Sequence, residues 1–357
     1  MPFITNNDVA NKLKHAALRN GDIIIADAAE DSIVGKCTEL FNIDEQLILS
    51  GLHTIAVRPA LPFASKYLGY YLNSSSYHDQ LLSLMQGTKV LSISKTALQN
   101  TNVRFPRSSE EQAQIGNYFQ KIDTLLNQHQ QKHDKLSNIK NAMLEKMFPK
   151  QGETIPEIRF KGFSEEWVEN NLGELIDIRS AARVHKEQWT EAGVPFFRTS
   201  DVVSIYKGHE NTKAYIPQEV YNGLSEKIGK VKKDDLLITG GGSIGIPYLV
   251  PNDNSLYFKD ADLLWLKNNK KINGYFLYTF FFSTFFKQHI KNISHTGTIA
   301  HYTIEQAKAT PINTCSEKEQ TAIGNYFQKL DALINQHQQQ ITKLTNIKQA
   351  CLSKMFV

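Results

Sequence analysis

The sequence predicts an α/β (α+β) protein with two globular domains, each followed by a long helix. Two observations lead to this prediction. The segment IGNYFQKIDTLLNQHQQ begins at Ile115, and the closely similar IGNYFQKLDALINQHQQ begins at Ile323, 208 positions later. That interval is too long for a solenoid repeat and is about the size of one domain with a connector. Strand-like segments also precede each copy, GDIIIA at Gly21 and DDLLIT at Asp234.

The repeat divides the 357 residues into four segments. We predict a first domain over residues 1–107, a helical segment over 108–150, a connector and second domain over 151–313, and a second helical segment over 314–357. The helical segments match at about two in three positions, whereas the domains share pattern more than identity. Met1 aligns near Ala214. The first domain is therefore expected to be N-terminally shortened.

Both helical segments carry apolar residues in a heptad pattern that is typical of a long helix packed along a partner. Ser108 and Ser316 each precede glutamates in the spacing of a capped helix start. Without an internal proline, each helix can run for about 34 residues, or about 50 Å. Because a whole domain separates the copies, we expect an antiparallel coiled coil. His129 and His337 would then meet as a polar layer that fixes the register, since two histidines are too few ligands for a metal site.

Composition and charge are those of a folded protein without strong bias. Hydrophobic residues make up 41%, charged residues 21%, and the net charge is +4, which permits a nucleic-acid partner. Cys37, Cys315 and Cys351 are isolated, as is typical of incidental thiols in a reducing cytosol. The longest apolar run, residues 274–286, is shorter than the roughly 20 residues that cross a bilayer, and it predicts a buried helix. We expect a cytoplasmic protein with no membrane partner.

The segment GGGSIG, residues 240–245, matches G-x-G-x-x-G after a strand-like segment. Ile246 and Pro247 follow where a nucleotide-binding loop would lead into a helix. We expect either a tight turn whose backbone N–H groups approach a phosphate, or a plain hairpin. The sequence contains neither an NPPY-like methyltransferase motif nor a GxxxxGK[ST] loop. We predict no catalytic residues, no metal and no cofactor.

Taken together, the chain resembles the specificity subunit of type I restriction–modification systems over nearly its whole length. The resemblance is carried by EEQAQIGNYFQKID…KLSNIKNAMLEKMF from Glu110, its repeat KEQTAIGNYFQKLD…KLTNIKQACLSKMF from Lys318, and IPEIRFKGFSEEWVENNLGEL from Ile155. It implies two target-recognition domains that each read half of a split site in double-stranded DNA. It also implies an antiparallel coiled coil that sets the gap between half-sites and docks two DNA methyltransferase subunits, with restriction subunits as further partners.

Candidate DNA contacts are basic and hydrogen-bonding residues that flank similar points of the two domains, because such side chains reach phosphates and base edges. In the first domain they are Lys12, Lys14, Lys36, Lys89 and Ser92; in the second they are Arg179, Arg183, Lys186, Arg198, Thr199, Ser200, Gly241, Ser243, Thr298 and His301. Apolar bulk beyond a two-helix seam marks an interface. The residues expected to bind partner subunits are Tyr118, Phe119, Leu126, Tyr326, Phe327 and Ile334.

The predicted function is that of a non-catalytic DNA sequence-recognition subunit of a type I restriction–modification complex. Two alternatives remain on the sequence alone. One is a catalytic DNA adenine methyltransferase, which would bind S-adenosylmethionine by itself. The other is a truncated, silent form that serves only as a structural scaffold. We expect the isolated chain to be poorly soluble, or to bind DNA weakly, until the modification subunits join it.

Overall fold

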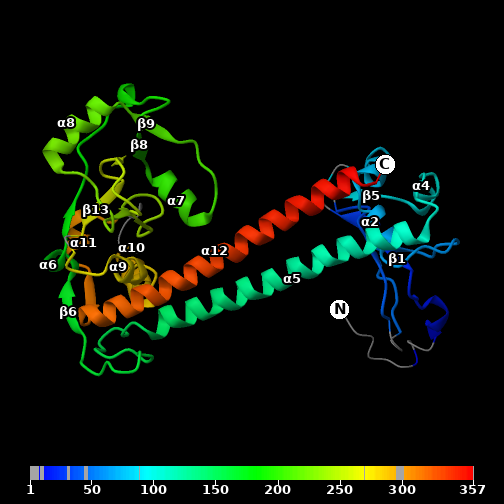
Figure 1. Cartoon of the computed structure of the whole chain (residues 1–357), viewed down its shortest axis with the longest axis horizontal. Helices are drawn as coiled ribbons and strands as arrows, with labels where there is room; N and C mark the ends of the chain where they lie inside the picture. Colours follow the sequence, from blue (N-terminus) through cyan, green and yellow to red (C-terminus); the bar gives the residue numbers. More distant parts are fainter. Residues whose placement is uncertain are drawn as a thin grey trace. The chain divides into compact units, whose positions relative to one another are not determined.

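The computed structural model is a mixed helix-and-strand protein with two long helices (Figure 1). It describes residues 8, 12–29, 33–43, 47–87, 89–268, 270–294 and 301–356. The chain forms two compact units, unit 1 with residues 1–133 and 336–357, and unit 2 with residues 134–335. The predicted fold class is confirmed. The four predicted segment boundaries stay a prediction. The division into two units does not test them, because each unit contains a part of both long helices.

Unit 1 is built on a small antiparallel sheet with the strand order β3-β1-β4. The predicted strand at residues 21–26 appears as β1, whose Ile23 and Ile25 point into a core with Tyr67, Tyr71 and Leu81. The elements are η1 (Lys14–Ala16), β1 (Ile23–Ala26), β2 (Ala28–Ala29), β3 (Cys37–Glu39), β4 (Thr54–Val57), α2 (Tyr67–Tyr71), α3 (Ser75–Leu82), β5 (Leu91–Ser92) and α4 (Lys95–Gln99).

Unit 2 contains a four-stranded antiparallel sheet with the order β11-β10-β13-β7. A second sheet has the order β12-β8-β9, and β14 pairs with β6. The predicted strand at residues 234–239 appears as β10, which is buried along its whole length. The strands are β6 (Val168–Asn171), β7 (Asp177–Arg179), β8 (Val194–Phe197), β9 (Ala214–Ile216), β10 (Leu236–Thr239), β11 (Pro247–Leu249), β12 (Tyr257–Phe258), β13 (Leu263–Lys267) and β14 (Pro311–Thr314).

The apolar run at residues 274–286 is buried as predicted, but it forms two helices rather than one. The first, α9 (Gly274–Phe280), ends before a turn at Ser283, whose buried hydroxyl accepts a hydrogen bond from the Phe286 N–H at 3.2 Å. This cap starts α10 (Thr284–Ser294). The other helices of unit 2 are α6 (Leu172–Leu175), η2 (Lys186–Gln188), α7 (Thr199–Lys207), α8 (Gln218–Ile228) and α11 (Ile304–Lys308). In the described part of the chain, no helix combines the length and apolarity that a membrane crossing needs.

The two long helices are α5 (Ser109–Lys146) and α12 (Glu317–Lys354), each of 38 residues. At 1.5 Å per residue each is about 57 Å long, somewhat longer than predicted. The capped starts are confirmed. The Ser108 hydroxyl accepts from the Glu111 N–H at 3.2 Å, and the Ser316 hydroxyl accepts from the Glu319 N–H at 3.4 Å.

The two long helices run antiparallel, as predicted. In unit 1, Lys348 of α12 binds Asp123 of α5 with 2.5 Å between Nζ and Oδ1. In unit 2, Lys140 of α5 binds Asp331 of α12 at the same distance. As residue numbers rise along α5, the residue numbers of their partners therefore fall along α12, which is the order of an antiparallel pair. The two ion pairs also use the same two positions of the repeat, once in each unit.

The same aspartates attach each unit to its helices. In unit 1, Tyr70 of α2 donates from its hydroxyl to Asp123 at 2.8 Å. In unit 2, Tyr275 of α9 donates to Asp331 at 2.6 Å. Burial and the neighbouring carboxylate raise the pKa of both tyrosines, so both stay protonated donors at neutral pH. Repeated docking contacts of this kind are one physical reason for the near-identity of the two helical segments.

Gly116 and Gly324 occupy the same repeat position because the backbone of each unit approaches the helix there. A Cβ at Gly324 would lie 2.5 Å from the Asn273 side-chain oxygen, which caps the start of α9. A Cβ at Gly116 would lie 3.0 Å from the carbonyl oxygen of Ser65. Any side chain at these positions would push the helix away from its unit.

The phenylalanine that follows each long helix is buried in a unit core. Phe356, after α12, packs against Tyr67 and stacks on Phe119 in unit 1, with 5.6 Å between the Phe356 and Phe119 ring centroids. Phe148, after α5, packs against Trp167 and Phe276 in unit 2. Each unit core therefore includes residues from the start of one long helix and the end of the other.

His129 and His337 meet in the helix pair of unit 1, as the antiparallel register predicts. Their Nδ1 atoms lie 2.9 Å apart, so one ring donates and the other accepts when both are neutral. Burial, His129 and the nearby Lys132 and His133 lower the pKa of His337 from its ordinary 6.5. Among the described residues, no group of three or more metal-ligating side chains is present. The contact is a polar layer in the seam.

Acidification is expected to loosen this layer. Because the folded-state pKa of His337 lies below its unfolded value, the folded state resists protonation, and stability is lost as the pH falls below about 6.5. As the pH falls from 7.5 to 5.5, the protection of the helix amides around His129 from hydrogen exchange should decrease, once the slower intrinsic exchange at lower pH is taken into account. His337→Gln should flatten this dependence. Equal pH dependence in the variant and the wild type would contradict the assignment.

Candidate nucleic-acid interface

Three segments of unit 2 meet at one end of its main sheet. Gly241, in the turn between β10 and β11, forms an isolated antiparallel bridge with His301. The Gly240 N–H donates to the Asp262 carbonyl at 2.8 Å, and the Thr199 hydroxyl donates to the same carbonyl at 3.3 Å. The sequence-predicted Thr199, Gly241 and His301 are therefore neighbours. We call this surface the hairpin end of unit 2; it comprises residues 240–245, 259–262 and 301.

The glycine-rich segment of unit 2 forms the turn of the β10–β11 hairpin. Gly242 and Gly245 have φ values of +71° and +79°, a backbone region that favours glycine. The Gly245 N–H closes the turn on the Thr239 carbonyl at 2.8 Å. A strand follows, where a dinucleotide-binding loop would continue into a helix. Ser243 is exposed at the tip of the turn.

Unit 1 has the same arrangement at the corresponding end of its sheet. The Asp27 N–H donates to the His53 carbonyl at 3.3 Å, which matches the contact between Gly240 and Asp262. Ala28 pairs with Ser92, which matches the bridge between Gly241 and His301. Ser92 and His301, both among the candidate DNA contacts predicted from the sequence, thus occupy the same structural position. The hairpin end of unit 1 comprises Asp27, Ala28, Gly35, Lys36, His53 and Ser92.

Basic side chains lie next to the hairpin end of unit 2, on the segment that follows β7. The Ser180 hydroxyl accepts from the Ala261 N–H at 3.1 Å, which ties this segment to the turn at 259–262. Arg183 and Lys186 follow it, both exposed, and among the described residues neither side chain forms a hydrogen bond or ion pair. Arg179 is partly used, because it binds Asp177 with 2.6 Å between Nη2 and Oδ2.

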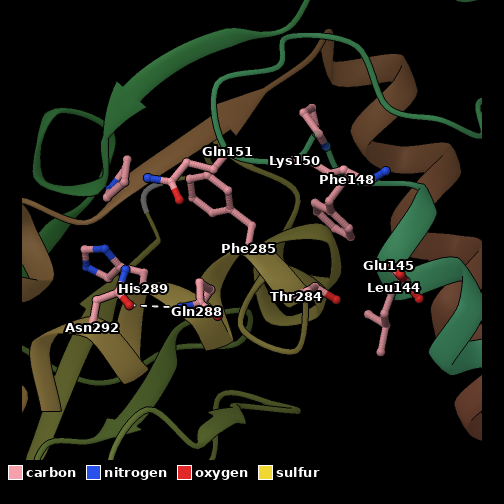
Figure 2. Close-up of a pocket in the computed structure, with 12 residues that line it drawn as sticks. Leu144, Glu145, Phe148, Lys150, Gln151, Thr284, Phe285, Gln288, His289 and Asn292 are labelled. Atoms are coloured by element: carbon pink, nitrogen blue, oxygen red, sulfur yellow. Dashed lines mark hydrogen bonds between the residues drawn. The ribbon is translucent and has the colours of Figure 1, made fainter. Parts of the chain in front are cut away.

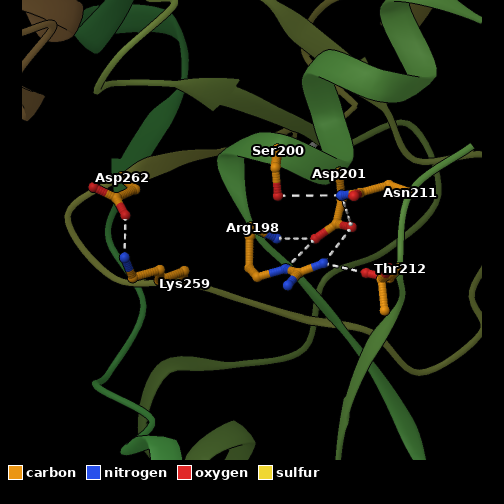
Figure 3. Close-up of polar contacts among 7 residues, drawn as sticks. All are labelled: Arg198, Ser200, Asp201, Asn211, Thr212, Lys259 and Asp262. Carbon is orange, nitrogen blue, oxygen red and sulfur yellow. Dashed lines mark hydrogen bonds and ion pairs between the residues drawn. The ribbon is translucent and has the colours of Figure 1, made fainter. Parts of the chain in front are cut away.

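Arg198 has a structural role that the sequence analysis did not predict. Figure 3 shows its guanidinium against Asp201, with distances of 2.8 Å from Nε to Oδ2 and 3.0 Å from Nη2 to Oδ1, and against the Thr212 carbonyl. The hydrogen bonds to Asp201 raise the pKa of Arg198. The carboxylate also caps α7 through the Arg198 N–H at 2.8 Å. Because its hydrogen-bonding fork is occupied, we leave Arg198 out of the proposed DNA contacts.

The remaining predicted residues differ in their placement. Ser200 is exposed beside Arg198 and accepts a hydrogen bond from the Asn211 amide at 3.2 Å (Figure 3). In unit 1, Lys36 and Lys89 are exposed, and Lys36 belongs to the hairpin end. Lys12 and Lys14 are exposed near η1, and no hydrogen bond or ion pair among the described residues joins them to the hairpin end. Thr298 lies outside the described residues.

Two residues of the hairpin ends were missed from the sequence. His53 has a side chain 82% exposed, with 4.0 Å between its Nδ1 and Oδ1 of Asp27. Lys259 projects beside the turn and binds Asp262 with 2.5 Å between Nζ and Oδ2 (Figure 3). The turns before β4 and β13 give little signal without knowledge of the pairing.

The residues predicted to bind partner subunits fall into two groups. Phe119 and Phe327 are completely buried in the cores of units 1 and 2, so they pack within the chain and are not part of an exposed surface. Tyr118 is 42% exposed, with its hydroxyl 3.6 Å from the Cys351 sulfur. Tyr326 is half-buried against Phe160. The two aliphatic residues, Leu126 and Ile334, are half-buried.

Packing does not explain the whole repeat, because several residues that are identical in both copies are exposed in both. Their side chains cover polar faces of the long helices, where substitution usually costs little stability. On α5 they are Asn117, Lys121, Asn127, Gln128, Gln131, Lys135 and Asn138, and on α12 they are Asn325, Lys329, Asn335, Gln336, Gln339, Lys343 and Asn346. We call these the repeated polar faces.

A cavity of about 240 Å³ lies in unit 2 beside the end of α5. Figure 2 shows Leu144 and Phe148 on the α5 side, and Phe285, Gln288 and His289 on α10. Burial lowers the pKa of His289, which favours its neutral form. None of the predicted DNA-binding residues lines this cavity. It belongs to the junction of α5 with α10 and is separate from the hairpin end.

Comparison with known proteins matches the type I restriction modification DNA specificity domain family over residues 1–138 and 164–346. A protein of Haemophilus influenzae that is named as a type I restriction enzyme specificity subunit is 28% identical over 167 residues. That alignment covers 46% of this chain and 40% of the relative, so the chain spans less than half of that protein in the match.

Two solved structures share the fold. The S subunit of a type I restriction–modification system from M. genitalium has a TM-score of 0.60 at 17% identity, covering 95% of this chain and 83% of that one. A chain from a study of complex assembly and conformational transition in a type I system has a TM-score of 0.54 at 18% identity, covering 95% and 82%. With the family match over most of its length, the chain belongs to the family of type I restriction–modification DNA specificity domains.

Proposed function

We propose that this chain is the DNA-recognition subunit of a type I restriction–modification complex and acts in the cytoplasm without catalytic residues, metal or cofactor of its own. The observation that carries this proposal is the recurrence of one arrangement in both units. Three parts meet at the same end of each sheet. They are the hairpin turn, the turn before β4 or β13, and Ser92 in unit 1 or His301 in unit 2. Each hairpin end would then read one half of a split site.

The side chains at the two hairpin ends suit such a role. Unit 2 supplies Ser243 and His301 as exposed hydrogen-bonding groups, with the exposed cations of Arg183 and Lys186 next to its hairpin end. Unit 1 supplies Lys36, His53 and Ser92, and the exposed Lys89 stands three residues before Ser92. The groups differ between the units while their backbone positions agree. Different half-site sequences are expected from that pattern, because phosphate contacts position a protein and base-edge contacts specify the sequence.

The helix pair would set the gap between the half-sites and dock the other subunits. The repeated polar faces support this proposal, because two identical exposed surfaces suit two copies of the same partner. Two methyltransferase subunits would each bind one face, with Tyr118, Leu126, Tyr326 and Ile334 at the borders. Restriction subunits would join that assembly. The isolated chain should then bind DNA less tightly than the assembled complex.

Replacing both Arg183 and Lys186 with alanine should weaken DNA binding by the assembled complex. The two cations carry no internal contacts among the described residues, so the fold should not change. If each neutralises one phosphate, the slope of log K against log salt should become less negative by about 2. Fluorescence anisotropy with a specific duplex between 50 and 300 mM salt measures this slope.

Lys318 provides the matched control, since it is exposed at the start of α12 and outside the hairpin end. Lys318→Ala should leave the slope unchanged. An unchanged slope in the Arg183/Lys186 double variant would remove these residues from the DNA contacts.

Titration of S-adenosylmethionine into the isolated chain separates the proposal from a catalytic methyltransferase. We expect no saturable binding, because the glycine-rich segment is a hairpin turn. A complex that contains the methyltransferase subunits but methylates no specific site would instead favour a scaffold role for this chain.

A further inference from the structure

A group of lysines gathers at the end of the main sheet of unit 2 that lies opposite the hairpin end. The chain enters β10 and leaves β13 there, because these two strands pair antiparallel and both meet the hairpin end at their other terminus. The flanking segments, residues 227–233 and 267–271, contain no carboxylate. Their lysines are Lys227, Lys230, Lys232, Lys233, Lys267, Lys270 and Lys271. We call this surface the basic end of unit 2; it comprises residues 227–233, 267, 268, 270 and 271.

A buried carboxylate holds the two lysine-bearing segments together. Asp235 is 2% exposed, and it accepts hydrogen bonds at 2.8 Å from the backbone N–H of Lys232 on one segment and from that of Asn268 on the other. The segments also meet at Gly229, where an added Cβ would lie 3.8 Å from Nζ of Lys267. The fold therefore brings both groups of lysines to one surface.

The charges of the basic end are not neutralised within the described part of the chain. Lys267 lies over the Trp265 ring, with 5.7 Å from Nζ to the ring centroid, and the other six lysines are exposed. Among the described residues, none of the seven side chains forms an ion pair or a hydrogen bond. The exposed carboxylates beside them are Glu226, Asp234 and Asp253. Seven lysines against three carboxylates leave this surface positively charged.

The composition of the basic end favours a phosphate backbone over a protein partner. Protein interfaces are anchored by aromatic and arginine side chains and are depleted in lysine. The basic end has no arginine and, among its described residues, no exposed large apolar side chain. An adjacent arginine, Arg179, is held by Asp177 and by the Ile228 carbonyl. Lysine ammonium groups neutralise phosphates as point charges, and phosphate contacts position a protein on DNA without reading its sequence.

We propose that the basic end of unit 2 binds the phosphate backbone of duplex DNA without sequence preference, as a contact surface separate from the hairpin end. The choice of DNA as the polyanion rests on the proposed function. The five residues of β13 separate the two ends by about 17 Å. The basic end therefore contacts phosphates that the hairpin end does not reach, and it adds affinity without changing the bases that are read.

The test is the salt dependence of binding between the full-length chain and a random-sequence duplex of about 30 base pairs. If each of four lysines neutralises one phosphate, their removal should make the slope of log K against log salt less negative by about 3.6. Fluorescence anisotropy between about 50 and 300 mM salt measures this slope. The basic-end variant combines Lys230→Gln, Lys232→Gln, Lys270→Gln and Lys271→Gln.

Four lysines of the repeated polar faces provide a control with the same loss of charge. All four are exposed, and none forms an ion pair among the described residues. The slope of this control should stay within about 1 of the wild type. Tryptophan fluorescence should show the same unfolding curve for the basic-end variant and the wild type, because the replaced side chains make no polar contacts. The control combines Lys121→Gln, Lys135→Gln, Lys329→Gln and Lys343→Gln.

The methylated motif separates this inference from the proposed function. Assembled complexes with the basic-end variant should methylate the same motif as the wild type, because these lysines read no bases. A wild-type complex that methylates no specific motif would contradict the proposed function, while the salt slope with random duplex still decides on the basic end. A change of slope no larger than that of the control would overturn the proposal, and so would a different methylated motif in the variant.

Discussion

Replacing residues 160–310 with the corresponding segment of another family member is expected to change one half-site of the recognised DNA completely. The other half-site and the gap between them should stay the same. The exchanged segment carries the whole hairpin end of unit 2, whereas that of unit 1 and both long helices are retained. Because a mismatched base pair typically costs about 1–3 kcal/mol, a full change of half-site should abolish binding to the original site. Sequencing of the methylated sites measures the result.

The boundaries of this exchange preserve the junction with the helices. Arg159, just before the exchanged segment, binds Glu319 of α12 with 2.6 Å between Nε and Oε1 and 2.7 Å between Nη2 and Oε2. Both residues remain in the hybrid. The hybrid therefore keeps the ion pair that attaches the start of the exchanged segment to α12.

The reciprocal experiment lengthens a helix. Inserting one heptad after Gln131 adds about 10 Å to α5, which corresponds to a gap wider by up to about 3 base pairs. Both half-site sequences should be unaffected. A heptad insertion that altered the half-site bases, or a domain exchange that altered only the gap, would show that the reading and spacing segments are assigned to the wrong parts of the chain.

Arg159→Ala should destabilise unit 2 by about 3 kcal/mol or more, since it leaves the carboxylate of Glu319 buried without its partner. The Glu319 side chain is 1% exposed and that of Arg159 12%. All three tryptophans of the chain lie in unit 2, so their fluorescence reports the unfolding of that unit alone. Chemical denaturation followed by fluorescence gives the loss of free energy of unfolding.

Two comparisons make this measurement specific. Arg179→Ala removes an ion pair whose side chains are 45% and 35% exposed, and it should cost no more than about 1 kcal/mol. The double variant Arg159→Met, Glu319→Leu replaces the buried pair with apolar side chains and should recover part of the stability lost in the single variant. A loss in Arg159→Ala no larger than in Arg179→Ala would contradict the role given to this pair.

The long helices could be predicted from the sequence because their signals are local. A serine cap, an uninterrupted heptad pattern and a repeat of known offset specify the start, the length and the partner of each helix. The contact between His129 and His337 followed from the antiparallel register alone. The heptad pattern could not separate an interface with another protein from packing within the chain. For this reason Phe119 and Phe327 were expected on a partner surface, whereas the structure buries both in the unit cores.

The candidate interface was only partly predictable, because its segments come together through strand pairing over long sequence distances. Gly241 and His301 were chosen separately, and nothing in the sequence indicates that they pair. Arg198 did carry a readable signal. Asp201 stands three residues later, at the spacing where a first-turn carboxylate closes a helix start, and it occupies the guanidinium.

The most direct test of the proposed function is a genome-wide map of methylated bases in cells that contain the methyltransferase subunits, with and without this chain. The account predicts methylation at a two-part motif with an unspecified gap, present only when the chain is present. In the Arg183/Lys186 double variant, methylation at that motif should fall. A methylation pattern that is identical with and without the chain would contradict the claim that this chain selects the DNA sequence.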